Sequence, residues 1–342
     1  MDALLLQLLN GFDKGGAYAL IALGLTVIFG TLGVVNFAHG ALFMMGAFCA
    51  VTFQKLITLA QITKVNSNLG FPVTKKVPYL ELWWGKTGTA IIDLAIPLSI
   101  LMAIPVMALI GILLERGLIR HFYKRTHAEQ ILVTFGMAIV LQEIIKAFFG
   151  ANPITVEAPA ALSGTAAVGE WFGLGSALVY PWWRLVYLAF SIVIIAAVFA
   201  FLRFTTWGMV VRAGMMDRET VGLLGINIQK RFTIVFGMAA VVAGLAGLMA
   251  VPILKADYNM GMDWLVLSFV VVVVGGMGSL PGAVVAGFML GIVQSFAAWL
   301  SSIDGLRDYL QGLDQIIIYL VAVVVLLVLP RGLMGRRGVM ED

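Results

Sequence analysis

Nine apolar runs, each bounded by charged residues, glycine or proline, are the feature of this sequence that most restricts its fold. They lie at about residues 15 to 33, 41 to 60, 89 to 114, 130 to 150, 185 to 202, 232 to 253, 265 to 276, 282 to 300 and 314 to 330. Because the runs are long and continuous and do not alternate, they predict helices rather than strands. With roughly 20 residues needed for each crossing, the sequence predicts an all-α, polytopic integral membrane protein with about 8 to 9 transmembrane helices. Residues 1–342 then form one transmembrane domain.

Composition restricts the functions open to such a chain. Hydrophobic residues make up 61% of the 342 residues and charged residues only 12%, whereas about a quarter of the residues in soluble domains are charged. The spans and their loops use the whole length, so a soluble catalytic domain does not fit. The single cysteine, Cys49, excludes a disulfide framework and a thiolate metal cluster. A net charge of +4 fits lysines and arginines at helix ends better than a nucleic-acid surface.

Motifs for nucleotide and metal binding are incomplete. Residues 85–87 end like a phosphate-binding loop, but Leu80 stands where that motif needs glycine. Residues 276–281 approximate a dinucleotide fingerprint, with Pro281 at its last glycine position and an apolar run behind it. The three histidines have no cysteine or carboxylate at metal-ligand spacing. We therefore expect no cofactor, no metal and no enzymatic activity.

Lysine and arginine are unevenly distributed among the connecting segments. They concentrate in 115–128, in 203–231 and in the tail 331–342, which the positive-inside rule places in the cytoplasm. The segments 254–264 and 301–314 carry more aspartate than basic residues and belong outside. Residues 61–88 hold four lysines and one glutamate, yet counting spans places this long loop insertion outside as well. We expect a cytoplasmic C-terminus.

Charged residues within the predicted spans are few. Glu143 is followed three residues later by Lys146, a spacing that puts both on one helix face and predicts an ion pair, with a pathway role as the alternative. Asp93 lies near the start of its span, where its carboxylate can reach interfacial water. A proton-driven carrier normally has buried acidic or basic relays in several helices. Their scarcity indicates that the energy for transport enters elsewhere.

Two segments interrupt the apolar sequence with glycine and polar residues: 33–42 and 275–287. A weak similarity between NFAHGALFMMGAF and GSLPGAVVAGFML is compatible with an internal repeat in which Gly-broken helices at matching positions mark a transport pathway. The alternative is that these residues form tight turns and let helices pack closely, as Gly287 and Gly291 would. The sequence leaves both interpretations open.

The polar segment 212–231 lies between two spans and predicts a short helix. Asp217 can cap this helix, Glu219 lies in the first turn where the helix dipole favours an anion, and Gly225 can end it in the left-handed conformation. Val221, Leu223, Leu224 and Ile226 then form a set of apolar side chains outside the membrane. Exposed apolar groups of this kind indicate a docking surface.

At these residues the chain resembles the membrane permease subunits of ATP-binding-cassette importers for branched-chain amino acids, a family that includes urea and short-chain amide importers. The resemblance covers nearly the whole chain and rests on VNFAHGALFMMGAF, ERGLIRHFYKRTHAEQILVTFGMAIVLQE, RAGMMDRETVGLLGIN, GGMGSLPGAVVAG and VLPRGLMGRRG. It implies a bacterial inner-membrane protein with a second homologous permease, two cytoplasmic ATPases and a soluble substrate-binding protein as partners. Glu219 and Gly225 keep the family's coupling spacing, whereas Thr220 and Val221 replace its two alanines.

Two sets of site residues follow. The residues expected to couple to the ATPase are Asp217, Glu219, Val221, Gly222, Leu224 and Gly225. The residues expected along the substrate pathway are Asn36, His39, Gly40, Gly275, Gly276, Gly278, Ser279 and Gly282. For His39 a helix-cap or interfacial hydrogen bond is the alternative. The transported solute is a branched-chain amino acid or, as alternatives, urea or a short-chain amide, and an ion-coupled carrier or a channel would be a different class of protein.

Overall fold

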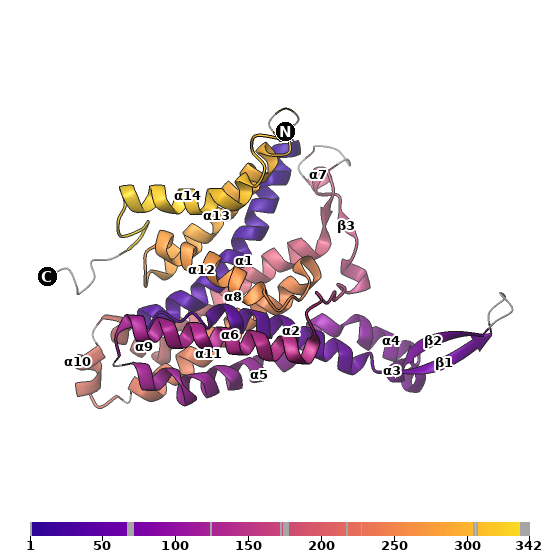
Figure 1. Cartoon of the computed structure of the whole chain (residues 1–342), viewed down its shortest axis with the longest axis horizontal. Coiled ribbons are helices and arrows are strands. Elements are labelled where there is room, and N and C mark those ends of the chain that lie inside the picture. The colour runs from indigo at the N-terminus through magenta and orange to yellow at the C-terminus, as the bar shows by residue number, and fades with distance from the viewer. Residues whose placement is uncertain are drawn as a thin grey trace.

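A computed structural model describes residues 2–66, 72–123, 125–171, 173, 178–216, 218–226, 228–303, 305 and 307–335 (Figure 1). These residues form α1 (Asp2–Leu32), α2 (His39–Ile57), β1 (Ala60–Asn66), β2 (Pro72–Pro78), α3 (Tyr79–Trp84), α4 (Lys86–Asp93), α5 (Ala95–Gly117), η1 (Ile119–Phe122), α6 (His127–Phe149), η2 (Ala160–Leu162), β3 (Thr165–Ala166), α7 (Val168–Trp171), β4 (Tyr180–Pro181), α8 (Trp182–Phe204), α9 (Thr206–Met216), α10 (Arg218–Leu223), α11 (Ile228–Leu254), α12 (Met260–Gly275), α13 (Leu280–Leu300) and α14 (Leu313–Val328).

Each of the nine predicted apolar runs is a helix, which confirms the all-α membrane architecture. In the described part of the chain, 7 helices are long and apolar enough to cross a membrane. The other two apolar helices, α12 and α14, have 16 residues each, fewer than the roughly 20 of a full crossing.

The first helix begins much earlier than expected. The sequence predicts a span from about residue 15, but α1 starts at Asp2 because its polar residues find partners on other helices. Ser295 Oγ donates to Gln7 Oε1 at 2.8 Å, and Arg184 Nη1 lies 3.5 Å from Asp13 Oδ2. A helix can therefore continue through a stretch that its composition alone would leave outside the membrane.

Small residues hold the buried helices together. Gly287 and Gly291 of α13 lie against Ala19 and Gly15 of α1, so closely that a side chain at either glycine would collide with backbone atoms. This confirms the predicted packing role of the two glycines. Along another seam, Gly46 of α2 lies against the backbone of α11. The helices α1 and α11 are the most deeply buried spans.

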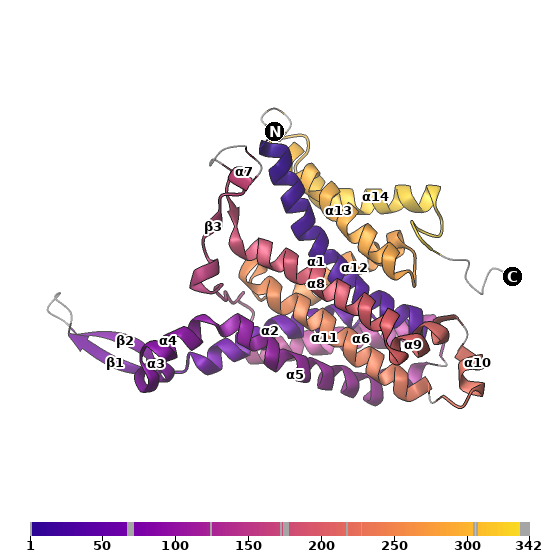
Figure 2. The ribbon, with the colours of Figure 1, turned by 180° about the vertical axis from the view of Figure 1, so that it is seen from behind.

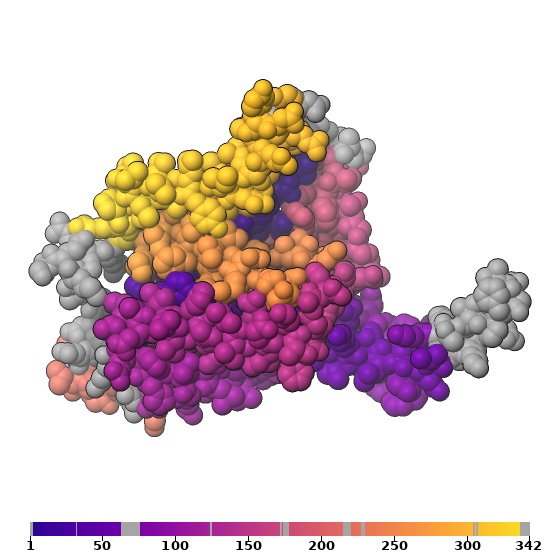
Figure 3. Space-filling view, viewed as in Figure 1, coloured from indigo at the N-terminus to yellow at the C-terminus, as the bar shows by residue number. Residues whose placement is uncertain are grey.

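The molecule has two distinct ends. α9 and α10 lie at one end of its long axis, and α3, α4 and the β1–β2 hairpin project at the other (Figures 1 and 2). The space-filling view shows the purple residues of α3 and α4 protruding from the helical body (Figure 3). The predicted loop insertion at 61–88 is thus folded, since β1 and β2 pair antiparallel from Ala60↔Pro78 to Asn66↔Pro72. Strand formation was not anticipated.

Candidate functional site

The segment expected to couple to an ATPase folds as α9 followed by the short α10. Asp217 lies outside the described residues, and for Glu219, which belongs to α10, the described part is the backbone. Gly225 has a φ of +77°, which confirms the predicted left-handed ending. Its N–H donates to the carbonyl oxygen of Gly222 at 3.1 Å.

The apolar side chains of this segment do not all face outward. Leu223 and Leu224 are 87% and 72% exposed, whereas Val221 is only 5% exposed. The expectation that Val221 belongs to an exposed apolar set is therefore wrong, because α10 packs against α9 and α11 and buries this residue. The exposed apolar surface at this end consists of Leu223 and Leu224, with Gly222 exposed beside them.

Two polar contacts fix α9 to its neighbours. The Arg231 guanidinium lies over the Trp207 ring, 3.6 Å from its centroid, a cation–π contact that ties α9 to the start of α11. Thr205 Oγ1 accepts a hydrogen bond from Gly208 N at 3.0 Å and so caps the helix. The Arg231–Trp207 contact therefore joins α9 to the start of α11.

The first interrupted segment is a buried connection between α1 and α2. Asn36 and His39 are both fully buried. Asn36 Oδ1 accepts from Ala38 N at 3.0 Å, and His39 Nε2 lies 3.1 Å from the carbonyl oxygen of Ile21. The His39 contact is a buried hydrogen bond to α1 and neither a helix cap nor an interfacial bond, so the role of His39 stays a prediction. Gly40 lies against Gly261 of α12.

The second interrupted segment is a tight turn between α12 and α13. Gly275 and Gly282 lie so close that a Cβ on either would collide with the other's backbone, and Ser279 Oγ caps α13 by accepting from Gly282 N at 3.2 Å. Gly276 and Gly278 have positive φ values of +101° and +83°. Turn formation and close packing, the alternative left open by the sequence, account for these contacts.

The two interrupted segments meet at the same end of α1. A Cβ at Gly278 would lie 3.7 Å from Gly30 Cα, and a hollow of about 10 Å³ is lined by residues of both connections, including Val35 and Met277. The residues that line this hollow are all apolar, so it offers no polar partner to a water molecule. Most of the predicted pathway residues are buried and Gly278 and Ser279 are half-buried. Their role in conduction stays a prediction.

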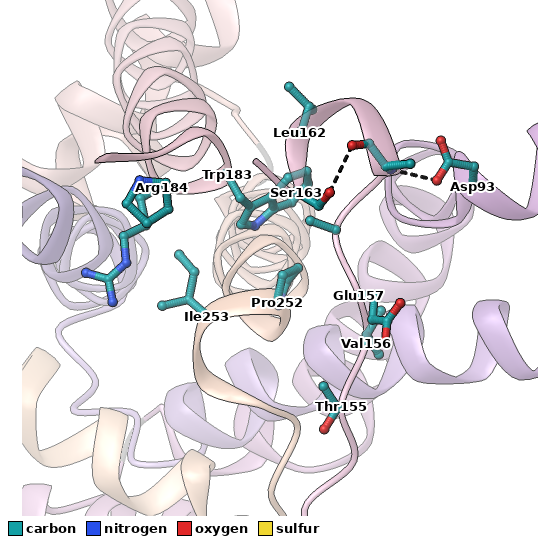
Figure 4. Close-up of a pocket in the computed structure, with 13 residues that line it drawn as sticks. Asp93, Thr155, Val156, Glu157, Leu162, Ser163, Trp183, Arg184, Pro252 and Ile253 are labelled. Atoms are coloured by element: carbon teal, nitrogen blue, oxygen red, sulfur yellow. Dashed lines mark hydrogen bonds between the residues drawn. The ribbon is translucent and has the colours of Figure 1, made fainter. Parts of the chain in front are cut away.

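A cleft of about 550 Å³ opens at the opposite end of the molecule (Figure 4). Its walls come from the end of α4, the segment after α6, the start of α8 and the end of α11. Trp183 and Arg184 of α8 form one wall, and behind them lies Tyr180, where burial raises the pKa of the phenol to about 12. No sequence motif indicated this cleft, since its walls are far apart in the chain.

The charged residues near the predicted span ends lie where the sequence placed them. Lys146 Nζ is 3.3 Å from Glu143 Oε1, which confirms the predicted ion pair. Asp93 is exposed at the end of α4, and its Oδ1 accepts a hydrogen bond from Ala160 N at 2.7 Å.

Comparison with known proteins identifies the family of this chain. Residues 7–329 match the family model described as branched-chain amino acid transport system / permease component. The chain belongs to this family. The permease is 26% identical to the high-affinity branched-chain amino acid transport system permease protein LivH of Escherichia coli (strain K12), over 96% of this chain and 95% of the relative. It is 27% identical to the corresponding protein BraD of Pseudomonas aeruginosa, again over 96% and 95%.

A more distant similarity extends beyond amino acid transport. The permease is 22% identical to the ribose import permease protein RbsC of Escherichia coli (strain K12), over 80% of this chain and 86% of the relative. No solved structure matches the permease. Family membership confirms that the chain is a transport permease in a membrane and not an enzyme.

One buried group near the coupling segment escaped the sequence analysis. Glu115, at the end of α5, is fully buried. Its Oε1 accepts from Tyr123 OH at 2.6 Å and its Oε2 from Thr233 Oγ1 at 2.7 Å. This Glu115 cluster joins α5, the residue after η1 and the first turns of α11. Glu115 and Thr233 are 118 positions apart in the chain, so no local spacing could reveal the cluster.

Proposed function

We propose that this permease is a membrane subunit of an ATP-driven importer in a bacterial inner membrane. It works with a second homologous permease, two cytoplasmic ATPases and a substrate-binding protein on the outer face. Its solute is a branched-chain amino acid, as the names of its relatives LivH and BraD state for those proteins. The chain itself supplies the passage, and the ATPases supply the energy.

The observation that carries this proposal is the short helix α10 with its exposed leucines. A side chain as apolar as Leu223, 87% exposed outside the predicted spans, calls for a partner surface. The left-handed Gly225 sets the direction in which the chain returns to α11. These features support a contact surface for an ATPase subunit that transmits its movement to the permease.

The distribution of charge supports a cytoplasmic position for this end. Tyr123 of the basic segment 115–128 and Phe232, directly after the basic segment 203–231, have ring centroids 6.4 Å apart. The basic tail begins at the end of α12, where Leu333 N donates to the carbonyl oxygen of Val274 at 2.8 Å. Under the positive-inside rule a cytoplasmic C-terminus follows.

The mechanism starts at the ATPases and ends at the interrupted helices. Closure of the ATPase dimer displaces α10, and α9 passes the displacement to α11 through the Arg231–Trp207 contact. Because α11 packs on α1, α2 and α5, its movement shifts the buried helices as a group. The connections at 33–38 and 276–279 then change the side from which the passage is open.

Reconstitution of the complete transporter in proteoliposomes tests this function. We expect uptake of leucine, isoleucine or valine that requires the loaded binding protein and ATP, and that stops when the ATPase subunits carry an inactivating substitution. Uptake that continues without ATP would contradict the proposal and favour an ion-coupled carrier or a channel. Urea, a short-chain amide and ribose, assayed in parallel, define the solute class.

A further inference from the structure

The cleft at the end opposite α9 and α10 has charges of opposite sign at its two sides. Figure 4 shows Arg184 at one side and Asp93 and Glu157 at the other, with Trp183, Pro252 and Ile253 between them. At about 550 Å³ the cleft lies within the roughly 300–1,000 Å³ of pockets that hold small molecules. In the proposed orientation it faces the outer medium.

Arg184 retains hydrogen-bonding capacity at the wall of the cleft. Its Nη1 lies 3.5 Å from both Asp13 Oδ2 and Asn10 Oδ1, longer than the about 2.7–2.9 Å of a strong charge-assisted bond. A guanidinium has five N–H donors in a planar fork that matches a carboxylate. An incoming carboxylate would find donors that these two long contacts do not satisfy.

A buried aspartate holds the guanidinium in this place. Asp13 is 4% exposed, and its Oδ1 has no hydrogen-bond partner in the described part of the chain. Tyr180, also buried, lies close enough to Arg184 for its phenol to interact with the guanidinium. The sequence assigned neither Asp13 nor Arg184 a role. Together they form a pair of charged groups with an unbonded oxygen, Asp13 Oδ1, next to the wall of the cleft that Arg184 lines.

The opposite side offers carboxylate oxygens and the middle is apolar. Asp93 uses Oδ1 to accept from Ala160 N, which leaves its other oxygen toward solvent, and Glu157 is exposed. Between the charges the Trp183 ring is held by a hydrogen bond from its Nε1 to the carbonyl oxygen of Met249 at 3.1 Å. A lone anion is repelled at one side of this cleft and a lone cation at the other.

We propose that the cleft is a low-affinity acceptor site for a zwitterionic aliphatic solute, an α-amino acid with an apolar side chain. Arg184 receives its carboxylate, the field of Asp93 and Glu157 draws its ammonium group, and Trp183, Pro252 and Ile253 contact its side chain. This inference rests on the proposed function and adds to it the place where solute released by the binding protein is first held. Because the ammonium and carboxylate groups of an α-amino acid are attached to the same carbon, only one of them contacts its partner closely while the other is attracted across the cleft, and the binding is weak.

Protection of an introduced cysteine tests the inference in the complete transporter. Cys49 is the sole cysteine and is buried, so Cys49→Ala gives a cysteine-free background. Ser163→Cys places a thiol at the cleft, and Ser302→Cys, on an exposed residue outside the cleft lining, is the matched control. The rate of reaction with a membrane-impermeant thiol reagent is measured with increasing leucine, isovalerate or isoamylamine.

We expect millimolar leucine to slow the labelling of Ser163→Cys and to leave Ser302→Cys unchanged. Isovalerate and isoamylamine, which each carry one of the two charges, should protect much less. Arg184→Gln removes a charge-assisted hydrogen bond and should raise the leucine concentration for half-protection about tenfold or more. Because this change leaves Asp13 buried without its counter-charge, Asp13→Asn/Arg184→Gln repeats the test with the whole pair removed.

Three results would overturn the inference: no protection by leucine, equal protection by the two singly charged analogues, or undiminished protection in both arginine variants. ATP-driven uptake by the parent transporter, measured in the same preparation, distinguishes failure of the acceptor site from failure of the proposed function. Uptake without cleft protection leaves the proposed function standing and removes the acceptor site. Leucine uptake that is independent of ATP removes the proposed function.

Discussion

At Gly225 the backbone adopts a φ of +77°, a conformation that costs an L-residue with a side chain about 1–2 kcal/mol. No atom would clash with a Cβ at this position, so the conformation alone explains the choice of glycine. The residue ends the helix that we propose as the contact with the ATPase. Its substitution therefore tests the local geometry without disturbing the packing.

Gly225→Val should reduce solute transport per ATP hydrolysed, because a β-branched residue strongly disfavours this conformation and redirects the chain between α10 and α11. Gly225→Asn should retain most of the coupling, since asparagine tolerates the left-handed region. The measurement is the ratio of uptake to hydrolysis in proteoliposomes. Equal ratios in the two variants would remove the role assigned to this backbone angle.

Leu223 and Leu224 allow a second test at the level of single residues. Since both are largely exposed, Leu223→Ser/Leu224→Ser should leave the thermal stability of the isolated permease unchanged while weakening its copurification with the ATPase subunits. Tyr309→Ser is the control, because Tyr309 is 86% exposed outside this segment. Loss of the ATPase in the control, or its full retention in the leucine variant, would speak against the docking surface.

At the scale of elements, the Glu115 cluster joins α5 to the beginning of α11, the helix that follows the coupling segment. Thr233→Val and Tyr123→Phe each remove a hydrogen bond to a buried carboxylate, a loss of about 1–3 kcal/mol. We expect each variant to unfold at a lower temperature in detergent. Thr52→Val is the control, because Thr52 Oγ1 bonds only within its own helix, to the carbonyl oxygen of Phe48 at 2.7 Å.

The cluster should also contribute to coupling. If α5 and α11 move together, weakening their connection lowers the uptake obtained per ATP as well as the stability. A loss of stability with an unchanged uptake ratio would assign the cluster a purely structural role. If neither the stability nor the uptake ratio changed, this result would contradict the hydrogen bonds to Glu115.

Elements could be predicted from the sequence where their cause is local. The apolar runs gave the nine helices, because insertion in a bilayer depends on the composition of each run. The Glu143–Lys146 pair and the ending at Gly225 likewise follow from spacing and backbone chemistry within one segment. The early start of α1 could not be predicted, since it depends on partners such as Ser295 that lie at the other end of the chain.

In the candidate site, too, the features with a local cause could be predicted and those that depend on distant contacts could not. A short helix between two spans was predictable from the polarity of residues 212–231, but the burial of Val221 depends on how α10 packs on α9 and α11. The cleft with Arg184 combines four distant segments, and no motif spans them. Long-range packing, which a single sequence does not display, decided both outcomes.

At the scale of the whole molecule, the two ends of the permease are expected on opposite sides of the membrane. On the Cys49→Ala background, Ser302→Cys should react with an impermeant thiol reagent in intact cells, and Leu224→Cys only after permeabilisation. These residues are exposed in the permease, so access decides the labelling. Reaction of Leu224→Cys in intact cells would reverse the orientation and place α10 out of reach of a cytoplasmic ATPase.

The central claim is that energy enters this permease from outside its spans, through α10. The most direct test is the ratio of leucine uptake to ATP hydrolysis for Glu219→Lys in the complete reconstituted transporter. The substitution reverses the charge in the first turn of α10, where the helix dipole favours an anion. We predict normal membrane insertion with uptake largely lost, whereas ATP-dependent uptake at the parent ratio would contradict the claim.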